Sequence, residues 1–151
     1  MSRVLLSGMS GTGKSTLLEA VARRGYRCVD TDDGDWFDEQ RRWDTARITE
    51  LLESSETLLV QGTVENQGQF YHWFDHIVLL SAPLDVLLAR VRSRTNNPYG
   101  RTAAERTEIA HCHRTVEPLL RKGCTLELDG RQSVQRLADT VESLLRQPIS
   151  G

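Results

Sequence analysis

The fold is decided by the stretch Val4-Leu5-Leu6-Ser7-Gly8-Met9-Ser10-Gly11-Thr12-Gly13-Lys14-Ser15-Thr16. An apolar run ends at Gly8, a glycine-rich loop follows, and Lys14-Ser15 opens a helical pattern. This is the phosphate-binding pattern G-x-x-x-x-G-K-[ST] in the context it requires, after a strand and before a helix. The sequence therefore predicts a nucleotide-phosphate site in this loop.

Each residue type in the loop has a physical role. The glycines let the backbone curl so that successive N–H groups point at phosphate oxygens, and the helix N-terminus adds its own N–H groups. Lys14 would reach the β- and γ-phosphates, and the Ser15 hydroxyl would ligate Mg²⁺. The residues expected to contact ATP are Gly8, Ser10, Gly11, Thr12, Gly13, Lys14, Ser15 and Thr16.

Length, charge and cysteine content limit the remaining possibilities. A chain of 151 residues is predicted to form one domain over residues 1–151, active as a monomer or a dimer. Its net charge of −2 gives no bulk attraction to nucleic acid or to acidic membranes, and no apolar run is long enough to span a bilayer. The three scattered cysteines, with no C-x-x-C pair, favour reduced thiols and a cytoplasmic location.

Hydrophobic periodicity predicts five short strands that alternate with helices. The expected strands are residues 3–7, 26–29, 57–61, 76–80 and 124–128. The expected helices are residues 15–24, 38–54, 83–94, 103–122 and 133–146, with a loop and a short helix in 62–75. This alternation indicates an α/β fold of three layers, a parallel sheet covered on both faces, with ligands at the carboxyl ends of its strands.

Two aspartates follow the second expected strand and are candidates for the chemistry. Asp30 and Asp32 lie two residues apart, so in extended geometry they share one face. One carboxylate can hold Mg²⁺ through its waters while the other, Asp32, accepts a proton from an acceptor hydroxyl. The alternative is a turn with a helix cap, because Asp is favoured at both places.

Other candidates flank the same expected cleft. The segment 95–102 is dense in turn residues and could form a short lid, whose Arg94 and Arg101 would bring positive charge to the transferred phosphate. The alternative is a plain surface loop beside a solvated helix face. After the second and third strands, Trp36 could stack on an acceptor, and Gly62 and Thr63 would border it.

At these residues the chain resembles the small P-loop kinases of the shikimate, gluconate and nucleoside-monophosphate kinase group. The resemblance covers nearly the whole chain, and it is also the pattern of AAA-type ATP-binding proteins. It rests on residues 8–15, on Val29-Asp30-Thr31-Asp32, on Leu79-Leu80-Ser81-Ala82-Pro83 before an arginine-bearing helix, and on the strand–loop–helix from Cys124. It implies a P-loop NTPase fold with strand order 2-3-1-4-5.

The resemblance also implies roles for individual residues. Asp30 would support Mg²⁺ and Asp32 would meet the acceptor hydroxyl, as the two aspartates of the shikimate kinase D-x-D motif do. Arg94 or Arg101 would match the lid arginine that contacts phosphate or adenine. The loop containing Arg131 is similar to the loop that borders the adenine in this group.

The implied function is ATP-dependent, Mg²⁺-dependent transfer of the γ-phosphate to the hydroxyl of a small molecule. Shikimate kinases carry three glycines after strand three, where this chain has Gln61-Gly62-Thr63. They also carry an arginine for the acceptor carboxylate late in the long helix, where this chain has Val116 before Pro118. The resemblance therefore implies a kinase that is similar to shikimate kinase but acts on another acceptor.

Three alternatives remain open from the sequence, one of which is a nucleic-acid end kinase, disfavoured by the net charge of −2. A nucleoside-monophosphate kinase would need cations for a dianionic acceptor, and Arg41, Arg42 and Arg47 are available. A nucleotide-dependent switch or ATPase is the alternative of another class. No Asn-Lys-x-Asp base-reading motif is present, and the third and fourth strands end in Gln61 and Ser81, where a motor ATPase would have an acidic residue.

Overall fold

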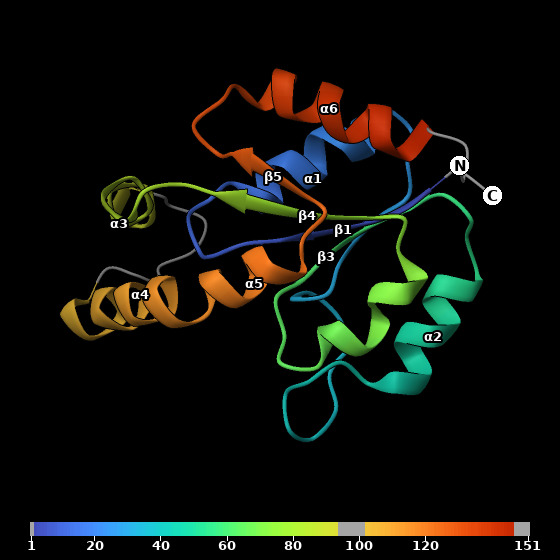
Figure 1. The fold of residues 1–151 in the computed structure, drawn as a ribbon, viewed down its shortest axis with the longest axis horizontal. Helices are drawn as coiled ribbons and strands as arrows, with labels where there is room; N and C mark the ends of the chain where they lie inside the picture. The colour runs from blue at the N-terminus through green and yellow to red at the C-terminus, as the bar shows by residue number, and fades with distance from the viewer. Residues whose placement is uncertain (1, 94–101, 147–151) are drawn as a thin grey trace.

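A five-stranded parallel sheet forms the centre of the computed structural model, which describes residues 2–93 and 102–146. Its strands are β1 (Arg3–Ser7), β2 (Cys28–Asp30), β3 (Leu58–Gln61), β4 (His76–Ser81) and β5 (Leu126–Asp129). They pair in parallel in the order β2-β3-β1-β4-β5, as Figure 1 shows. The predicted P-loop NTPase fold and its strand order are confirmed.

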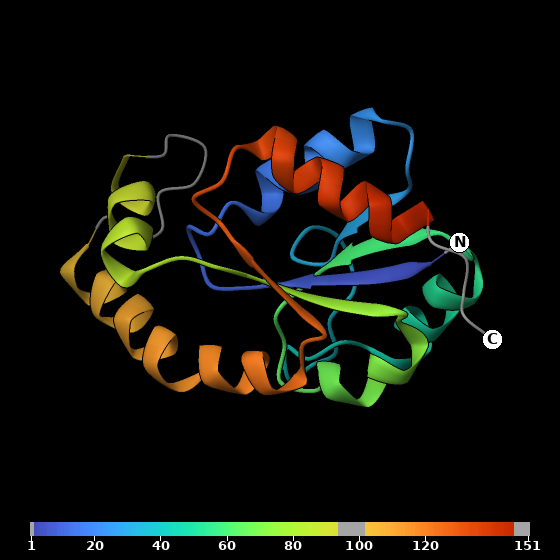
Figure 2. The ribbon, with the colours of Figure 1, turned by 45° about the horizontal axis from the view of Figure 1, so that its top comes forward.

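Helices cover both faces of the sheet (Figures 1 and 2). On one face lie α1 (Lys14–Arg23) and α6 (Val134–Arg146), and on the other lie α2 (Thr45–Glu53), the 3₁₀ helix η1 (Gln67–Trp73) and α5 (Glu117–Gly123). The remaining helices are α3 (Leu84–Ser93) and α4 (Ala103–Thr115), beyond the carboxyl end of β4.

Alternation along the strands divides the core between the two faces. On the α1 and α6 face, the buried cluster includes Val4 and Leu6 of β1. The intervening residue Leu5 points to the opposite face, where it packs in a cluster with Trp43 and Ile48. All five side chains are fully buried, so β1, which leads into the phosphate-binding loop, is held rigidly from both sides.

The helix expected over 38–54 is shorter in the structure, where α2 begins at Thr45. The side chain of Asp44 caps the helix by accepting from the Arg47 N–H at 3.1 Å. Before it, Asp38 accepts from the N–H of Arg42, in a turn closed by a bridge between Phe37 and Trp43. The apolar pattern that predicted the longer helix therefore included Trp43, a buried residue of the turn, together with the true apolar face of α2.

The helix expected over 103–122 is divided into α4 and α5 at Val116. Pro118 occupies the first turn of α5, where its missing N–H costs nothing, but in an unbroken helix it would remove a hydrogen bond. Figure 2 shows the two helices following one another as a bent arm across one side of the molecule.

The proposed lid falls largely outside the described residues. Arg94, Arg101 and the residues between them are not described, and of the segment 95–102 only Thr102 is. Thr102 caps α4 in a capping box with Glu105. Within residues 2–93 and 102–146, no helix has the length and apolar character needed to cross a membrane.

Candidate active site

The loop after β1 has the backbone geometry of a phosphate cradle. Gly13 has a φ of +99° and directly precedes α1, a conformation that side-chain-bearing residues rarely adopt. Gly8 lies against the neighbouring strand, because a Cβ there would come 2.3 Å from the carbonyl oxygen of Leu80. Both glycines are therefore required by the path of the backbone, and the loop leads into the N-terminus of α1.

Lys14 lies over this loop. Its ammonium group donates hydrogen bonds to the carbonyl oxygens of Gly8 at 2.6 Å and of Met9 at 3.0 Å. The buried Thr12 hydroxyl donates to the same Met9 oxygen at 2.9 Å. The ammonium is thus held where phosphate oxygens can replace the carbonyl groups.

A buried anchor fixes the two aspartates after β2. Thr31 is fully buried, and its hydroxyl donates to the carbonyl oxygen of Gln61 at 2.8 Å while it accepts from the indole N–H of Trp43 at 3.0 Å. The backbone N–H of Asp32 donates to the carboxylate of Asp30 at 2.9 Å. With Thr31 held in the core, Asp32 lies in the lining of the cleft and Asp30 lies next to it, bonded to the Asp32 N–H.

Asp32 has the electrostatics of a carboxylate suited to accept a proton. Its pKa is raised from the ordinary value, first because the cleft removes part of its solvent and second because the charge of Asp30 is near. The ammonium of Lys14 opposes this shift, so the three groups share one electrostatic environment. A carboxylate with a raised pKa is a stronger base than one in open water.

Thr63 connects the loop after β3 to the phosphate loop. Its hydroxyl accepts from the Gly8 N–H at 3.2 Å and donates to the Gly8 carbonyl oxygen at 3.1 Å. Gly62 is buried, and a Cβ there would lie 2.5 Å from the Thr31 hydroxyl and 2.8 Å from the Trp43 ring. The glycine lets the strand end pack against the anchor of the aspartates.

These groups open into a cleft of about 790 Å³. It is lined by part of the phosphate loop with Lys14, by Asp32 and Thr63 after β2 and β3, and by residues of α4 and α5. The residues that line it are Gly8, Met9, Ser10, Lys14, Asp32, Thr63, Val64, Glu65, Gln67, Gly68, Tyr71, Glu108, Ile109, Cys112, Val116, Leu119 and Leu120. The volume is within the range of pockets that hold small molecules.

Arg90 of α3 connects the phosphate loop to the loop after β5. Its guanidinium donates to the carbonyl oxygens of Gly11 and Thr12, each at 3.2 Å. The same group donates to the carbonyl oxygen of Gly130 at 2.8 Å. Sequence reasoning did not select Arg90 as a site residue, because a cation that binds backbone carbonyl groups leaves no pattern in the sequence.

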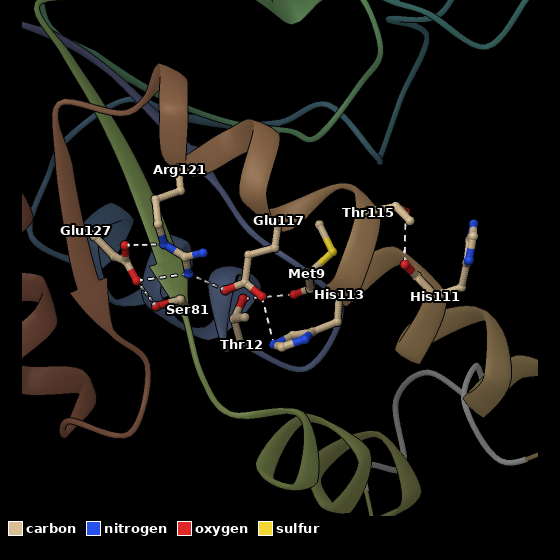
Figure 3. Close-up of polar contacts among 9 residues, drawn as sticks. All are labelled: Met9, Thr12, Ser81, His111, His113, Thr115, Glu117, Arg121 and Glu127. Atoms are coloured by element: carbon tan, nitrogen blue, oxygen red, sulfur yellow. Dashed lines mark hydrogen bonds and ion pairs between the residues drawn. The ribbon is translucent and has the colours of Figure 1, made fainter.

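An ion network links α5 to the end of α4 and to β5 (Figure 3). Glu117 is buried between His113, whose Nε2 lies 2.8 Å away, and Arg121, whose guanidinium donates at 3.1 Å. Arg121 also donates to Glu127 of β5 at 2.8 Å, and Glu127 accepts from the Ser81 hydroxyl at 2.7 Å. These two hydrogen bonds hold the pKa of Glu127 below its usual value.

The site contains oxygen ligands of the kind that Mg²⁺ prefers. Ser15 is exposed on the first turn of α1, directly after Lys14, and Asp30 ends β2. A hydroxyl and a carboxylate at the edge of a phosphate cradle fit Mg²⁺, which binds few protein oxygens and keeps several waters. The residues present are therefore compatible with an ATP–magnesium complex.

The comparisons with known proteins give the same fold. The model of an AAA domain family matches residues 4–111. The chain belongs to this family. No match was found among curated proteins.

Several solved structures similar to this AAA domain protein are kinases. Shikimate kinase from Acinetobacter baumannii, in complex with shikimate, is 19% identical with a TM-score of 0.71, over 96% of this chain and 93% of that one. A gluconokinase from Sinorhizobium meliloti 1021 is 20% identical, with a TM-score of 0.63, over 95% and 90%. Deoxyadenosine kinase from M. mycoides with bound dATP is 13% identical, with a TM-score of 0.66, over 97% and 100%.

Two residues that were expected at the site border hollows other than the main cleft of the AAA domain. Trp36 borders a separate hollow with Arg47, away from the main cleft. Arg131 is exposed and paired with Asp129 at 2.9 Å, lining another hollow that is formed with residues of α5. That pair holds the pKa of Asp129 down to about 2.

The wall from α4 and α5 is the part of the AAA domain site that sequence reasoning missed, apart from Val116. The apolar residues of this wall recur at ordinary helical spacing, which is typical of residues packed in a core. The 64% exposure of Leu119, directly after Pro118, is visible only in the structure.

Proposed function

We propose that this protein is an ATP-dependent, Mg²⁺-dependent phosphotransferase that moves the γ-phosphate of ATP to the hydroxyl of a small molecule. The observation that carries the proposal is that Lys14 and Asp32 line the same cleft and interact electrostatically there. One is the phosphate-binding cation and the other is a carboxylate with a raised pKa. The similar kinase structures support the same reaction class.

On the nucleotide side, the chain supplies positioning and positive charge. The N–H groups of the phosphate loop and of the α1 N-terminus bind phosphate oxygens, and Lys14 exchanges its contacts with Gly8 and Met9 for the phosphates. Ser15 and Asp30 would hold Mg²⁺, which when bound neutralises charge on the phosphates. Arg90 holds the phosphate loop in position through its hydrogen bonds to the carbonyl oxygens of Gly11 and Thr12.

On the acceptor side, Asp32 accepts a hydrogen bond from the hydroxyl that attacks. As the acceptor oxygen forms its bond to the γ-phosphorus, the hydroxyl proton passes to the Asp32 carboxylate. The bond between the γ-phosphorus and the oxygen that bridges it to the β-phosphate breaks, and ADP leaves with that oxygen. Thr63 and the walls of the cleft hold the acceptor and exclude water.

The described part of the cleft disfavours a nucleoside monophosphate as acceptor. The three arginines that would suit a dianionic phosphate lie away from the cleft lining. Arg42 contacts Asp38, Arg47 contacts Asp35, and Arg41 is exposed in a turn. A hydroxyl acceptor therefore agrees better with the residues that line the cleft.

The experiment is ADP release from Mg-ATP across a panel of hydroxyl-bearing acceptors, with phosphorylated product identified by mass spectrometry. The panel holds sugars, sugar acids, shikimate, nucleosides, nucleoside monophosphates and hydroxylated amines. We expect one class to raise ADP release well above the rate without acceptor. Steady ADP release that no acceptor raises would overturn the proposal in favour of a nucleotide-dependent switch or ATPase.

A further inference from the structure

The acceptor end of the cleft has one apolar wall. Ile109, Val116, Leu119 and Leu120 line it from α4 and α5, with Met9 beside them. Leu119 is left 64% exposed, although burying a leucine side chain typically contributes about 1.5–3 kcal/mol. An occupant that covers this wall needs a hydrocarbon surface of its own.

The described lining of the same cleft also carries carboxylates, two of them on the exposed residues Glu65 and Glu108. Glu65, at the end of the loop before η1, and Glu108 of α4 join Asp32 in the lining. Against these three carboxylates, Lys14 is the single cation among the lining residues that the structure describes. Three negative charges and one positive charge leave a formal charge of −2 on the described lining at neutral pH.

The acidic groups that pair with arginine in the described residues lie outside the lining of the cleft. Arg24 contacts Asp139 and Glu142, and Arg131 contacts Asp129. Over residues 2–93 and 102–146, no such ion pair holds either glutamate of the cleft. As far as the described residues go, an anionic acceptor would meet like charge at these glutamates, whereas an ammonium group would be attracted.

We propose that the acceptor is a hydroxylated amine with an apolar body, whose ammonium group is recognised by Glu65 and Glu108 while its hydrocarbon part covers the wall at Leu119. The inference rests on the proposed kinase reaction for the role of the hydroxyl. The charge and the apolar wall that carry it do not depend on turnover. Glu65 and Glu108 are thus specificity-determining residues for the acceptor.

A thiol placed in the cleft can measure its charge directly. Gly68 lines the cleft, and a Cβ at this position meets nothing within 4 Å, so Gly68→Cys introduces a reporter without a clash. The three native cysteines are first replaced by serine. The control reporter is Ala22→Cys, exposed on α1. Native Cys112, which also lines the cleft, provides a second reporter in a chain where only Cys28 and Cys124 are replaced.

The measurement compares two thiol reagents of opposite charge, 2-(trimethylammonio)ethyl and 2-sulfonatoethyl methanethiosulfonate. We expect the ratio of the cationic to the anionic rate to be about tenfold higher at the cleft reporters than at the control, because a negative cleft concentrates cations. Glu65→Gln combined with Glu108→Gln should reduce the ratio to the control value. The proposal would be overturned if, at both cleft reporters, the ratio of the cationic to the anionic rate equals the ratio at the control or falls below it.

A second arm tests the apolar wall together with the charge. Cyclohexylmethylamine and cyclohexanecarboxylate are each tested as protectants of the cleft reporter against the neutral methyl methanethiosulfonate. The amine should slow the reaction at least threefold and the carboxylate should not, with the protection lost in the double glutamine variant. If the amine and the carboxylate protect the reporter equally, or if the amine does not protect it, the proposed acceptor class is rejected. A failed kinase reaction would appear only in the ADP-release assay, so the two proposals fail separately.

Discussion

The guanidinium of Arg90 donates a hydrogen bond to the carbonyl oxygen of Gly130 at 2.8 Å, which ties α3 to the loop after β5. The same group donates to the carbonyl oxygens of Gly11 and Thr12. One side chain therefore sets the distance between the phosphate loop and the loop that, by resemblance, borders the adenine. Its contribution can be measured apart from the chemistry.

Arg90→Met should weaken both folding and nucleotide binding. Three carbonyl groups lose a charged donor, so we expect the free energy of unfolding to fall by about 1–3 kcal/mol and the Kd for ATP to rise. Urea unfolding and calorimetric titration measure the two effects. The control is Arg92→Met, since Arg92 is exposed on the same helix. Equal effects of the two substitutions would contradict the role of Arg90.

Lys14→Ala should abolish phosphate transfer without unfolding the protein. The ammonium is the cation that the phosphate loop supplies, so we expect kcat to fall by at least about 10²-fold. Far-UV circular dichroism and ADP release provide the two readouts. Lys122, the other lysine of the chain, is exposed on α5, and Lys122→Ala should leave both readouts unchanged. Normal turnover in Lys14→Ala would remove the phosphate loop from the mechanism.

Asp32→Asn should lower kcat by about 10²–10⁴-fold and leave the affinity for ATP nearly unchanged, because a base acts in the transition state. Asp33→Asn is the matched control on the next, exposed residue. Weakened ATP binding with normal kcat would instead give Asp32 a structural or metal-supporting role.

The same carboxylate predicts the pH dependence of the wild-type enzyme. Asp32 accepts a proton only when it is ionised, so kcat/KM should fall as the pH drops through its pKa. Because desolvation and Asp30 raise that pKa, the fall should be centred above 3.8, the ordinary value. A pH series of initial rates, with stability checked at each pH, locates the midpoint. A midpoint at or below the ordinary value would contradict the assigned environment.

Gly62→Ala should destabilise the protein, by about 1–3 kcal/mol, because the added methyl group meets a packed core. It would lie 2.5 Å from the Thr31 hydroxyl and 2.8 Å from the Trp43 ring. Gly68→Ala is the matched control, since a Cβ there meets nothing within 4 Å. Urea unfolding of the two variants measures the difference in their free energy of unfolding. A fully stable Gly62→Ala with reduced acceptor affinity would show that Gly62 acts at the acceptor and not in the packing of Thr31 and Trp43.

Cys28 should react slowly with alkylating agents at mildly alkaline pH. Burial raises the pKa of its thiol to about 11, so little thiolate exists in the folded protein near pH 9. Since the folded state holds this proton more tightly than the unfolded state, stability should fall as the pH rises from about 9 to about 11. Peptide-resolved alkylation with iodoacetamide, folded and in urea, tests the first point. Equal rates in the two states would contradict it.

The sheet could be predicted from the sequence because its signals are local. Apolar runs, the glycine-rich loop and the breaks between them are sufficient for the strand order once the resemblance is included. The start of α2 could not be predicted from the sequence. Trp43 has the spacing of a helix face, but its backbone N–H donates to the side chain of Asn66, far along the chain. Such long-range contacts leave no periodic pattern.

The candidate site divides in the same way. The phosphate loop and Asp32 follow from short motifs, and the structure brings Lys14 and Asp32 to one cleft. The acceptor wall depends on how α4 and α5 fold back over the sheet, a tertiary arrangement that the spacing of Ile109 and Leu120 cannot reveal. Arg90 was missed for a related reason, since its partners are carbonyl groups that every residue has.

The packing of α6 against α1 also bears on synthesis by the ribosome. The backbone N–H of Ser2 bonds to the carbonyl oxygen of Leu145 at 3.1 Å, and Val141 and Leu145 belong to the same buried cluster as Val4 and Leu6. The nucleotide loop thus emerges before the helix that covers its supporting layer, because α6 follows it by more than a hundred residues. A nascent chain stalled before residue 134 would expose this apolar face, a natural surface for a chaperone to bind.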